Sequence, residues 1–130
     1  MSVNESSASR SFSRDLRLLS AESYKNVFAK AQRFGNHSFT VLVRTNDLSH
    51  PRLGLAISKK CAKRAVDRNR IKRIFRESFR NHQHKLPNVD IIAMCKPNAV
   101  ALNKGEMRKQ IDTQWYFIKK KYARLKAAAK

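Results

Sequence analysis

The stretch SKKCAKRAVDRNRIKRIFRESFR, residues 58–80, combines dense positive charge with the spacing of a helix that packs on a core. Ten of its 23 positions are Lys or Arg, and only Asp67 and Glu77 oppose them. On a helix predicted over about 62–82, one face carries Ile71, Ile74, Phe75, Ser78 and Phe79. The opposite arc carries Asn69, Lys72, Arg73, Arg76 and Arg80. One face of this helix is therefore expected to pack inward and the other to present a wall of cations.

The cations of this helix repel one another at the spacing that brings side chains together. Arg68–Lys72, Lys72–Arg76 and Arg76–Arg80 are like-charged pairs four residues apart, which together cost on the order of 1 kcal/mol. A merely solvated helix normally mixes the two signs of charge. Phosphate binding explains the repulsion better, and the planar guanidinium of Arg suits phosphate especially well.

Length and charge agree with this interpretation. The 130 residues suit one domain, and a hydrophobic fraction of 42% is enough for one modest core. Twenty-nine basic and nine acidic residues give a formal net charge of +20, which destabilises a compact chain by self-repulsion. The excess indicates a polyanionic partner, with nucleic acid the first candidate and an anionic membrane surface the second.

Neither a spanning segment nor a secretory leader is evident in the sequence. The Ser-rich start loosely resembles a transit peptide, but Glu5 and the lack of amphipathic apolar positions favour a flexible tail over residues 1–11. Cys61 and Cys95 are expected to be reduced thiols, and the cytoplasm is the expected compartment.

The segment before the basic helix predicts one helix and two strands. Apolar spacing predicts a first helix over about 21–32, capped by Ser20 and ended by Gly35 and Asn36. Residues 37–45 and 52–58 are predicted strands, joined as a hairpin by a loop of about six residues. A short extra strand has room near Arg33–Phe34.

The segment after the basic helix predicts a strand and a long helix. Residues 89–95 form a nearly continuous apolar run, typical of a central strand covered on both faces. Asn103 and Glu106 form a capping box before a last helix whose apolar repeat runs to Leu125. A single domain over residues 12–122 is expected, followed by a basic tail over 123–130.

Catalytic chemistry is not evident in the sequence. The nine carboxylates are scattered, with no close pair for a two-metal site. Asp67 is expected to form an ion pair with Arg70 or Lys63, and His82 and His84 to be solvated or to contact RNA, rather than to ligate metal. Cys61 lacks a visible catalytic partner and is expected to be a packed thiol.

Aromatic residues offer a second possible binding surface. Tyr24 and Phe28 lie one turn apart on the first predicted helix, and Phe39 starts the next strand. They are either ordinary core residues or the lining of an open cleft between that helix and the sheet. In such a cleft, aromatic rings would stack on the bases of a single strand.

LGLAISKK, residues 53–60, followed by AVDRNRIKRIFRESFR, residues 65–80, resembles the bacterial ribonuclease P protein subunit. The similarity extends to LRLLSAESYKNVF upstream and VDIIAMCKP downstream, and covers roughly residues 12–122. The resemblance implies an α+β fold of order α-β-β-β-α-β-α, with helices packed on a mixed sheet. It also implies that the basic helix is a left-handed crossover between parallel strands, against the usual right-handed rule.

The resemblance implies an accessory subunit of a ribonucleoprotein endonuclease, a hydrolase that removes the 5′ leader of precursor tRNA. The RNA subunit would hydrolyse the phosphodiester with Mg²⁺, and the protein would carry no catalytic residue, cofactor or metal. The implied contacts to the RNA subunit are Arg68, Asn69, Arg70, Lys72, Arg73 and Arg76. The implied lining of the leader cleft is Tyr24, Phe28, Phe39, Val41, Lys59 and Lys60.

Two other functions remain open at this point. A ribosomal or other structural RNA-binding protein fits the size and charge equally well, and only the motifs disfavour it. A protein-only nuclease is disfavoured by the scattered acidic residues.

Overall fold

The computed structural model describes residue 17 and residues 21–46 and 48–129. The seven main elements are α2 (Ala21–Lys30), β1 (Gln32–Gly35), β2 (Phe39–Thr45), β3 (Arg52–Leu55), α3 (Ala65–His82), β4 (Val89–Cys95) and α4 (Lys104–Ala129). Two short 3₁₀ helices, η2 (Gln83–Lys85) and η3 (Pro97–Ala101), flank β4. The predicted order α-β-β-β-α-β-α is confirmed, including the short extra strand, which is β1.

The strands form one mixed sheet in the order β1-β2-β4-β3. β4 pairs antiparallel with β2 and parallel with β3, and its first five residues are buried. The prediction of a central strand at residues 89–95 is therefore confirmed. Its continuous apolar run fits this place, because both of its faces are covered by helices.

The predicted hairpin between residues 37–45 and 52–58 is wrong. β4 lies between β2 and β3, and the hairpin partner of β2 is β1. The Asn36 side-chain oxygen accepts hydrogen bonds from the backbone N–H groups of Ser38 and Phe39, at 3.3 and 3.0 Å, and so builds the turn. The predicted stop of the first helix at Gly35–Asn36 is also displaced, since α2 ends at Lys30.

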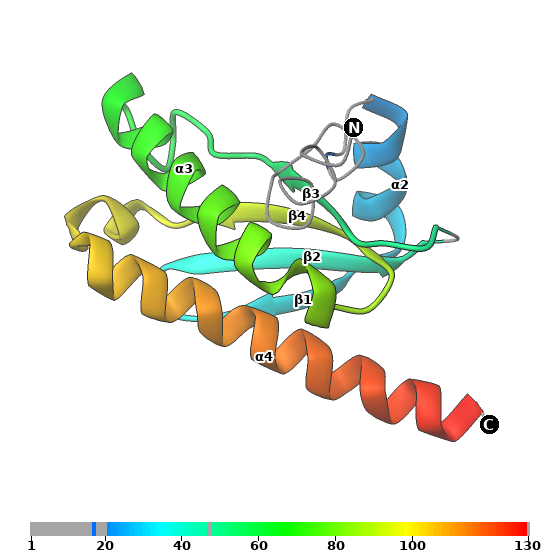
Figure 1. The fold of residues 1–130 in the computed structure, drawn as a ribbon. Coiled ribbons are helices and arrows are strands. Elements are labelled where there is room, and N and C mark those ends of the chain that lie inside the picture. The colour runs from blue at the N-terminus through cyan, green and yellow to red at the C-terminus, as the bar shows by residue number, and fades with distance from the viewer. Residues whose placement is uncertain (1–16, 18–20, 47, 130) are drawn as a thin grey trace, which may run out of the picture.

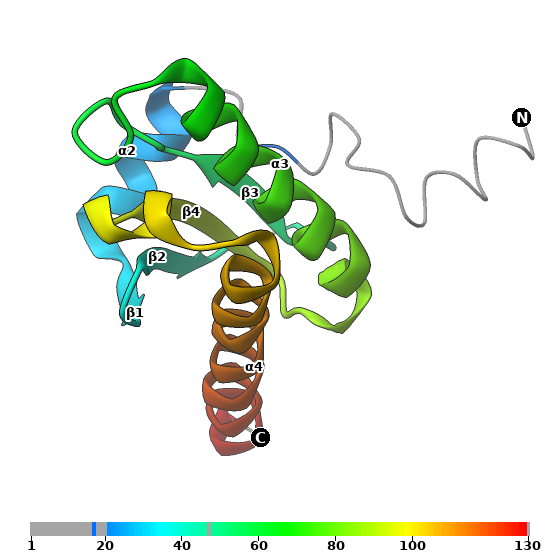
Figure 2. The ribbon, with the colours of Figure 1, turned by 90° about the vertical axis from the view of Figure 1, so that its left-hand side faces the viewer.

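The α3 crossover between β3 and β4 is left-handed. In Figure 1 both strands run toward the left, β3 lies above β4, and α3 passes in front of the sheet. Figure 2 shows the sheet from the side, with α3 and α2 on opposite faces of it. Right-handed crossovers are the strong rule for parallel strands, so sequence patterning alone would have predicted the opposite hand.

The larger core lies between the sheet and the two helices α3 and α4 (Figures 1 and 2). Its centre is Trp115, which is fully buried and makes edge-to-face contacts with Phe75 and Phe79. The Trp115 indole N–H donates to the Ser78 hydroxyl at 2.7 Å, and that hydroxyl donates to Asp112. These bonds join α3 to α4 and satisfy the polar groups that the core encloses.

A smaller core lies on the other face of the sheet, under α2. It consists of Val27, Leu42 and Ile92. Because strand residues alternate between faces, Leu42 belongs to this side, and its neighbours Val41 and Val43 belong to the larger core. The sheet is therefore covered by two helices on one face and by one short helix on the other.

The last helix begins with the predicted capping box. The Asn103 side chain accepts from the Glu106 N–H at 2.8 Å, and the Glu106 carboxylate accepts from the Asn103 N–H at 2.9 Å. The helix runs to Ala129, so residues 123–129 continue α4 rather than forming a separate tail (Figure 1). The expected N-terminal tail over 1–11 and the Ser20 cap lie outside the described residues. None of the helices in the described ranges has the length and apolar character to cross a membrane.

Candidate nucleic-acid interface

The outer face of α3 forms the predicted wall of cations. Asn69, Arg73 and Arg76 are exposed, and Lys72 is partly exposed. Arg80, predicted on the same arc, is also only partly exposed, and its Nε is buried. The predicted inner face is confirmed, because Ile71, Ile74, Phe75, Ser78 and Phe79 are all buried. Packing of the inner face fixes the rotation of the helix, and this rotation holds the cations toward solvent.

Two of the predicted RNA contacts also support the fold. One guanidinium nitrogen of Arg68 donates to the carbonyl oxygens of Ala62 and Lys63, at 2.9 and 2.8 Å. Arg70 donates to the carbonyl oxygens of Val100 and Leu102, at 3.0 and 3.2 Å. Helical spacing carries no sign of these bonds, because their acceptors lie outside the helix. Each guanidinium has five N–H donors, so both side chains keep donors for a second partner.

Asp67 forms an ion pair, but its partner differs from the prediction. Arg64 donates to the Asp67 carboxylate through Nε at 2.9 Å, whereas Arg70 or Lys63 was expected. This hydrogen bond, followed by the charge of Asp67, raises the pKa of Arg64. Arg70 is unsuited to Asp67 because its donors are directed at the segment before α4.

The β3–α3 connection, residues 56–64, places two more cations beside the start of α3. Lys59 and Lys60 are exposed, whereas Ile57, Cys61 and Ala62 are buried. The backbone N–H groups of Cys61 and Ala62 donate to the Ser58 carbonyl oxygen at 3.2 and 3.0 Å. The buried residues and this turn anchor the connection, so that both lysines extend from a fixed base.

Phe28 is exposed, whereas its neighbour Val27 is buried. The exposed fraction of Phe28 is 52%, so the interpretation of this ring as core is wrong. Tyr24 is half-buried, and its hydroxyl accepts a hydrogen bond from the Leu55 N–H at 3.0 Å. This bond ties α2 to the end of β3, where the chain leads on to Lys59 and Lys60.

The placement of Phe39 and Val41 in an open cleft is wrong. Both residues are fully buried in the core under α3 and α4, on the face of the sheet opposite α2. Alternation along β2 directs Leu42 toward α2 instead. In the register of β2 against β4, Leu42 lies opposite Ile92, and both belong to the smaller core under α2.

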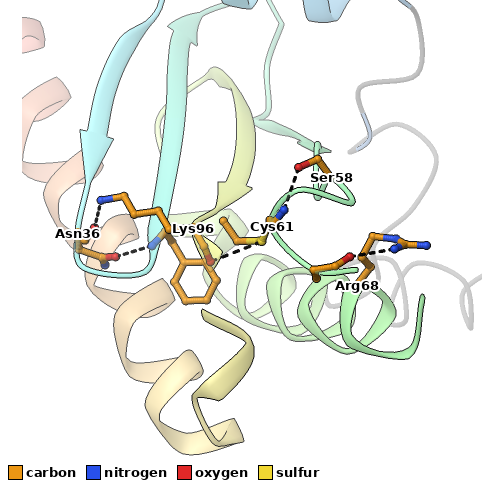
Figure 3. Close-up of a disulfide and its surroundings, with 8 residues drawn as sticks. Asn36, Ser58, Cys61, Arg68 and Lys96 are labelled. Carbon is orange, nitrogen blue, oxygen red and sulfur yellow. Dashed lines mark hydrogen bonds between the residues drawn. A yellow bond between two sulfur atoms is a disulfide. The ribbon is translucent and has the colours of Figure 1, made fainter. Parts of the chain in front are cut away.

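The two cysteines are joined in a disulfide, contrary to the expectation of reduced thiols. Cys61 lies in the β3–α3 connection, and Cys95 is the last residue of β4. Their Cα atoms are 5.9 Å apart, which is within the usual range for a disulfide. Figure 3 shows Cys61 between Ser58, on its own connection, and Lys96, on the β4 side. Two cysteines allow only one pairing, and the expectation of reduced thiols rested on the lack of an evident secretory leader, which carries no information on the distance between them.

Metal ligands do not gather in the described ranges, where no group of three or more His, Cys, Asp or Glu side chains could hold an ion. The His82 ring donates through Nδ1 to the Ser78 carbonyl oxygen at 2.7 Å. This bond joins the His82 side chain to the backbone of the last turn of α3.

A second basic surface is formed by β1 and α4, outside α3 and the connection before it. A cavity of about 410 Å³ between β1 and α4 is lined by Arg33, Phe34, Phe117, Lys120 and Lys121, among others. Its three cations show that positive charge is not confined to α3.

Comparisons of the sequence and of the fold with known proteins point to the same family. The family model described as Ribonuclease P matches residues 12–119. The "Ribonuclease P protein component" of Vibrio campbellii is 53% identical over 81% of this chain and 89% of its own length. That of Thioalkalivibrio sulfidiphilus is 48% identical over 80% of this chain and 87% of its own.

Two solved structures share the architecture. The RNase P protein of Staphylococcus aureus aligns with a TM-score of 0.74 at 27% identity, covering 78% of this chain and 94% of that chain. The RNase P protein of Thermotoga maritima aligns with a TM-score of 0.69 at 25% identity, covering 80% of this chain and 96% of that chain. Together with the sequence matches and the cationic crossover helix, these alignments show that the chain belongs to the ribonuclease P protein family.

Proposed function

We propose that this chain binds the RNA subunit of ribonuclease P and the 5′ leader of precursor tRNA, and thereby assists removal of the leader. The observation that carries the proposal is the exposed cationic face of α3, held in place by a fully buried apolar face. Family membership supplies the identity of the RNA partner.

The surface for the RNA subunit consists of α3 and the connection before it. Arg73 and Arg76 are exposed, and neither forms a hydrogen bond or an ion pair with another described residue, so their guanidinium groups suit phosphate oxygens. Lys59 and Lys60 extend this surface at the start of the helix. Arg68 and Arg70 contribute the donors that their backbone bonds leave over.

The leader would lie along α2 rather than over the centre of the sheet. Phe28 offers an exposed ring on which a base of a single strand can stack. Tyr24 takes a positioning role, because its hydroxyl holds the end of β3 against α2. Phe39 and Val41 have no exposed surface and take no part.

Hydrolysis is assigned to the RNA subunit and its Mg²⁺. In this division of labour the protein supplies positive charge and orientation, and it needs neither a nucleophile nor a metal of its own. Positive charge beside the RNA lowers the concentration of Mg²⁺ that the RNA needs in order to fold and to bind substrate.

Reconstitution tests the proposal and separates it from the alternatives. The protein is mixed with ribonuclease P RNA and precursor tRNA at a Mg²⁺ concentration too low for the RNA alone. We expect cleavage at the 5′ end of the mature tRNA only when both subunits are present. Cleavage by the protein alone would establish a nuclease, and failure to restore cleavage would favour a structural RNA-binding protein.

The variant Phe28→Ala tests the leader surface. We expect it to reduce the preference for leader-bearing over mature tRNA by about fivefold or more, since stacking of one base contributes ~1–3 kcal/mol. Its stability should change little, because the ring is half exposed. Asn26→Ala, an exposed and uncharged substitution on the same helix, is the control. An unchanged preference in folded Phe28→Ala would remove Phe28 from the leader surface.

A further inference from the structure

Cys61 and Cys95 link two parts of the fold that have different tasks. Cys61 belongs to the connection that carries Lys59 and Lys60, and Cys95 ends the central strand. The disulfide closes a covalent ring that contains all of α3. The bond therefore joins the cationic surface directly to β4, a central strand of the sheet.

The same site also accommodates the reduced form. The Cys61 sulfur lies 3.6 Å from the Lys96 carbonyl oxygen, within reach of a hydrogen bond that a thiol would donate (Figure 3). The Lys96 backbone is held independently, because its N–H donates to the Ser38 carbonyl oxygen at 2.8 Å. The acceptor for the Cys61 thiol is thus in place whether or not the disulfide is formed.

The two sulfurs differ in access. Cys61 is only 6% exposed, whereas Cys95 is partly exposed at the end of its strand. Reagents in solution therefore reach Cys95 first, and Cys61 is placed to attack from within. This arrangement of one accessible and one resolving thiol is typical of reversible redox pairs.

We propose that Cys61 and Cys95 are a redox modification site, oxidised by low-molecular-weight disulfides of the glutathione type, which tightens binding of RNA by fixing the β3–α3 connection. The effect on RNA rests on the proposed function. Glutathione disulfide is anionic, and Lys59, Lys60, Lys63, Arg64 and Lys96 lie within three residues of the two cysteines. Their positive potential favours its approach.

The chemical step is two successive exchanges. The Cys95 thiolate attacks one sulfur of glutathione disulfide, a mixed disulfide forms at Cys95, and one glutathione thiolate leaves with the electron pair. The Cys61 thiolate then attacks the Cys95 sulfur and displaces the second glutathione thiolate. The protein loses two electrons and its two thiol protons, and both are recovered in two molecules of reduced glutathione.

Oxidation tightens binding because it removes freedom from the surface before RNA arrives. In the reduced form the connection is held at Cys61 by packing and by hydrogen bonds from its thiol and its backbone N–H. A covalent bond to β4 restricts the base from which Lys59 and Lys60 extend. We expect the oxidised protein to bind about three- to tenfold more tightly, the effect of sparing one or two side chains the entropy cost of ordering.

The first experiment follows the disulfide in the full-length protein without RNA. The protein is equilibrated in glutathione buffers of increasing oxidised-to-reduced ratio, trapped with an alkylating reagent and weighed by mass spectrometry. We expect a loss of two hydrogens with a Cys61–Cys95 peptide cross-link, reversed by reduced glutathione. Cys95→Ser should stop mixed-disulfide formation at the exposed position, and Cys61→Ser should accumulate it. Failure of the cross-link to form at any ratio overturns the proposal.

The second experiment measures the affinity for ribonuclease P RNA of the fully oxidised and the fully reduced protein. We expect the oxidised wild type to bind about three- to tenfold more tightly than the reduced one, and Cys61→Ser with Cys95→Ser to be insensitive to the buffer. Equal affinity of the two forms overturns the coupling and leaves the proposed function standing. Absence of RNA binding in both forms, with the cross-link present, contradicts the proposed function instead.

Discussion

The arginines of the α3 surface divide into two kinds. Arg68 and Arg70 direct donors at backbone carbonyl oxygens of neighbouring segments, at 2.8 to 3.2 Å. Arg73 and Arg76 are exposed on the outer arc of the helix. Under the proposed function, loss of a residue of the first pair would affect both the fold and RNA binding, whereas loss of a residue of the second pair would affect binding alone.

Substitution at Arg70 and Arg73 should separate these roles. Arg70→Ala leaves the Val100 and Leu102 carbonyl oxygens without their donor, so we expect it to lower the free energy of unfolding by about 1–3 kcal/mol. Arg73→Ala should change stability by less than about 0.5 kcal/mol. Both should weaken binding of ribonuclease P RNA. Urea denaturation and RNA titration measure the two quantities, and equal stability of both variants would contradict the division.

At this scale the sequence predicted which residues face outward and which face inward on α3, since one helical period decides both. It did not predict the bonds of Arg68 and Arg70, because their acceptors belong to segments whose positions depend on the whole fold. The error at Phe39 and Val41 has a related cause. Alternation shows that they share a face of β2, but not which helix covers that face.

Burial of Tyr122, on α4, makes the free energy of unfolding depend on pH in the alkaline range. Burial raises the pKa of its phenol above the ordinary value, so the folded state favours the neutral form. This stabilisation is complete below pH ~10, the unfolded pKa, and is lost as pH rises through the raised folded pKa. We expect Tyr122→Phe to lose less stability than the wild type between pH ~9 and ~11. Urea denaturation across this range measures it, with Tyr116→Phe, an exposed site, as the control.

At the scale of elements, α3 and α4 are joined by a polar contact within an apolar core. Ser78 accepts from the Trp115 indole and donates to Asp112, and all three residues lie where the helices meet. The hydroxyl is fully buried and so has no access to water in place of these partners. It thereby fixes the rotation of α4 against the helix that carries the cations.

Removal of that hydroxyl should loosen the helix pair. We expect Ser78→Ala to lower the free energy of unfolding by about 1–3 kcal/mol, because it leaves the Trp115 N–H buried without an acceptor. Thr113→Ala, on the exposed side of α4, should cost less than about 0.5 kcal/mol. The fluorescence of Trp115 during denaturation reports the transition. An unchanged free energy of unfolding in Ser78→Ala would show that the Trp115 indole finds another acceptor.

The elements themselves were well predicted, and their pairing was not. The apolar run at 89–95 and the capping box at Asn103 lead to β4 and α4 because both signals are local. The hairpin between the second and third strands was wrong because strand propensity does not reveal which distant strand inserts between two neighbours. The left hand of the crossover came from the family resemblance, since physical preference favours the opposite hand.

At the scale of the whole molecule, charge governs association. A formal net charge of +20 makes binding to RNA a release of counterions as much as a set of contacts. The basic cavity between β1 and α4 shows that the positive potential extends beyond α3. Salt concentration is therefore the condition that should change the affinity most.

Affinity for ribonuclease P RNA should fall steeply as salt rises. If four or more phosphates are neutralised, the slope of log affinity against log salt concentration should be about −3 or steeper. The double variant Arg73→Ala and Arg76→Ala should reduce the magnitude of that slope by about 1–2. Titration at several KCl concentrations measures both slopes. A flat dependence in the wild type would show that phosphate contacts do not dominate.

The position of β4 also orders events during translation. The ribosome releases β1, β2, β3 and α3 before β4, yet β4 lies between β2 and β3. Until residue 95 emerges, β3 has no partner among these strands, and the apolar face of α3 has no completed sheet to cover. The basic helix α3 is thus synthesised before the strand that completes the core under its apolar face. Pairing of β3 therefore follows the synthesis of β4, so the order of the strands in the sheet delays completion of the fold until most of the chain has been made.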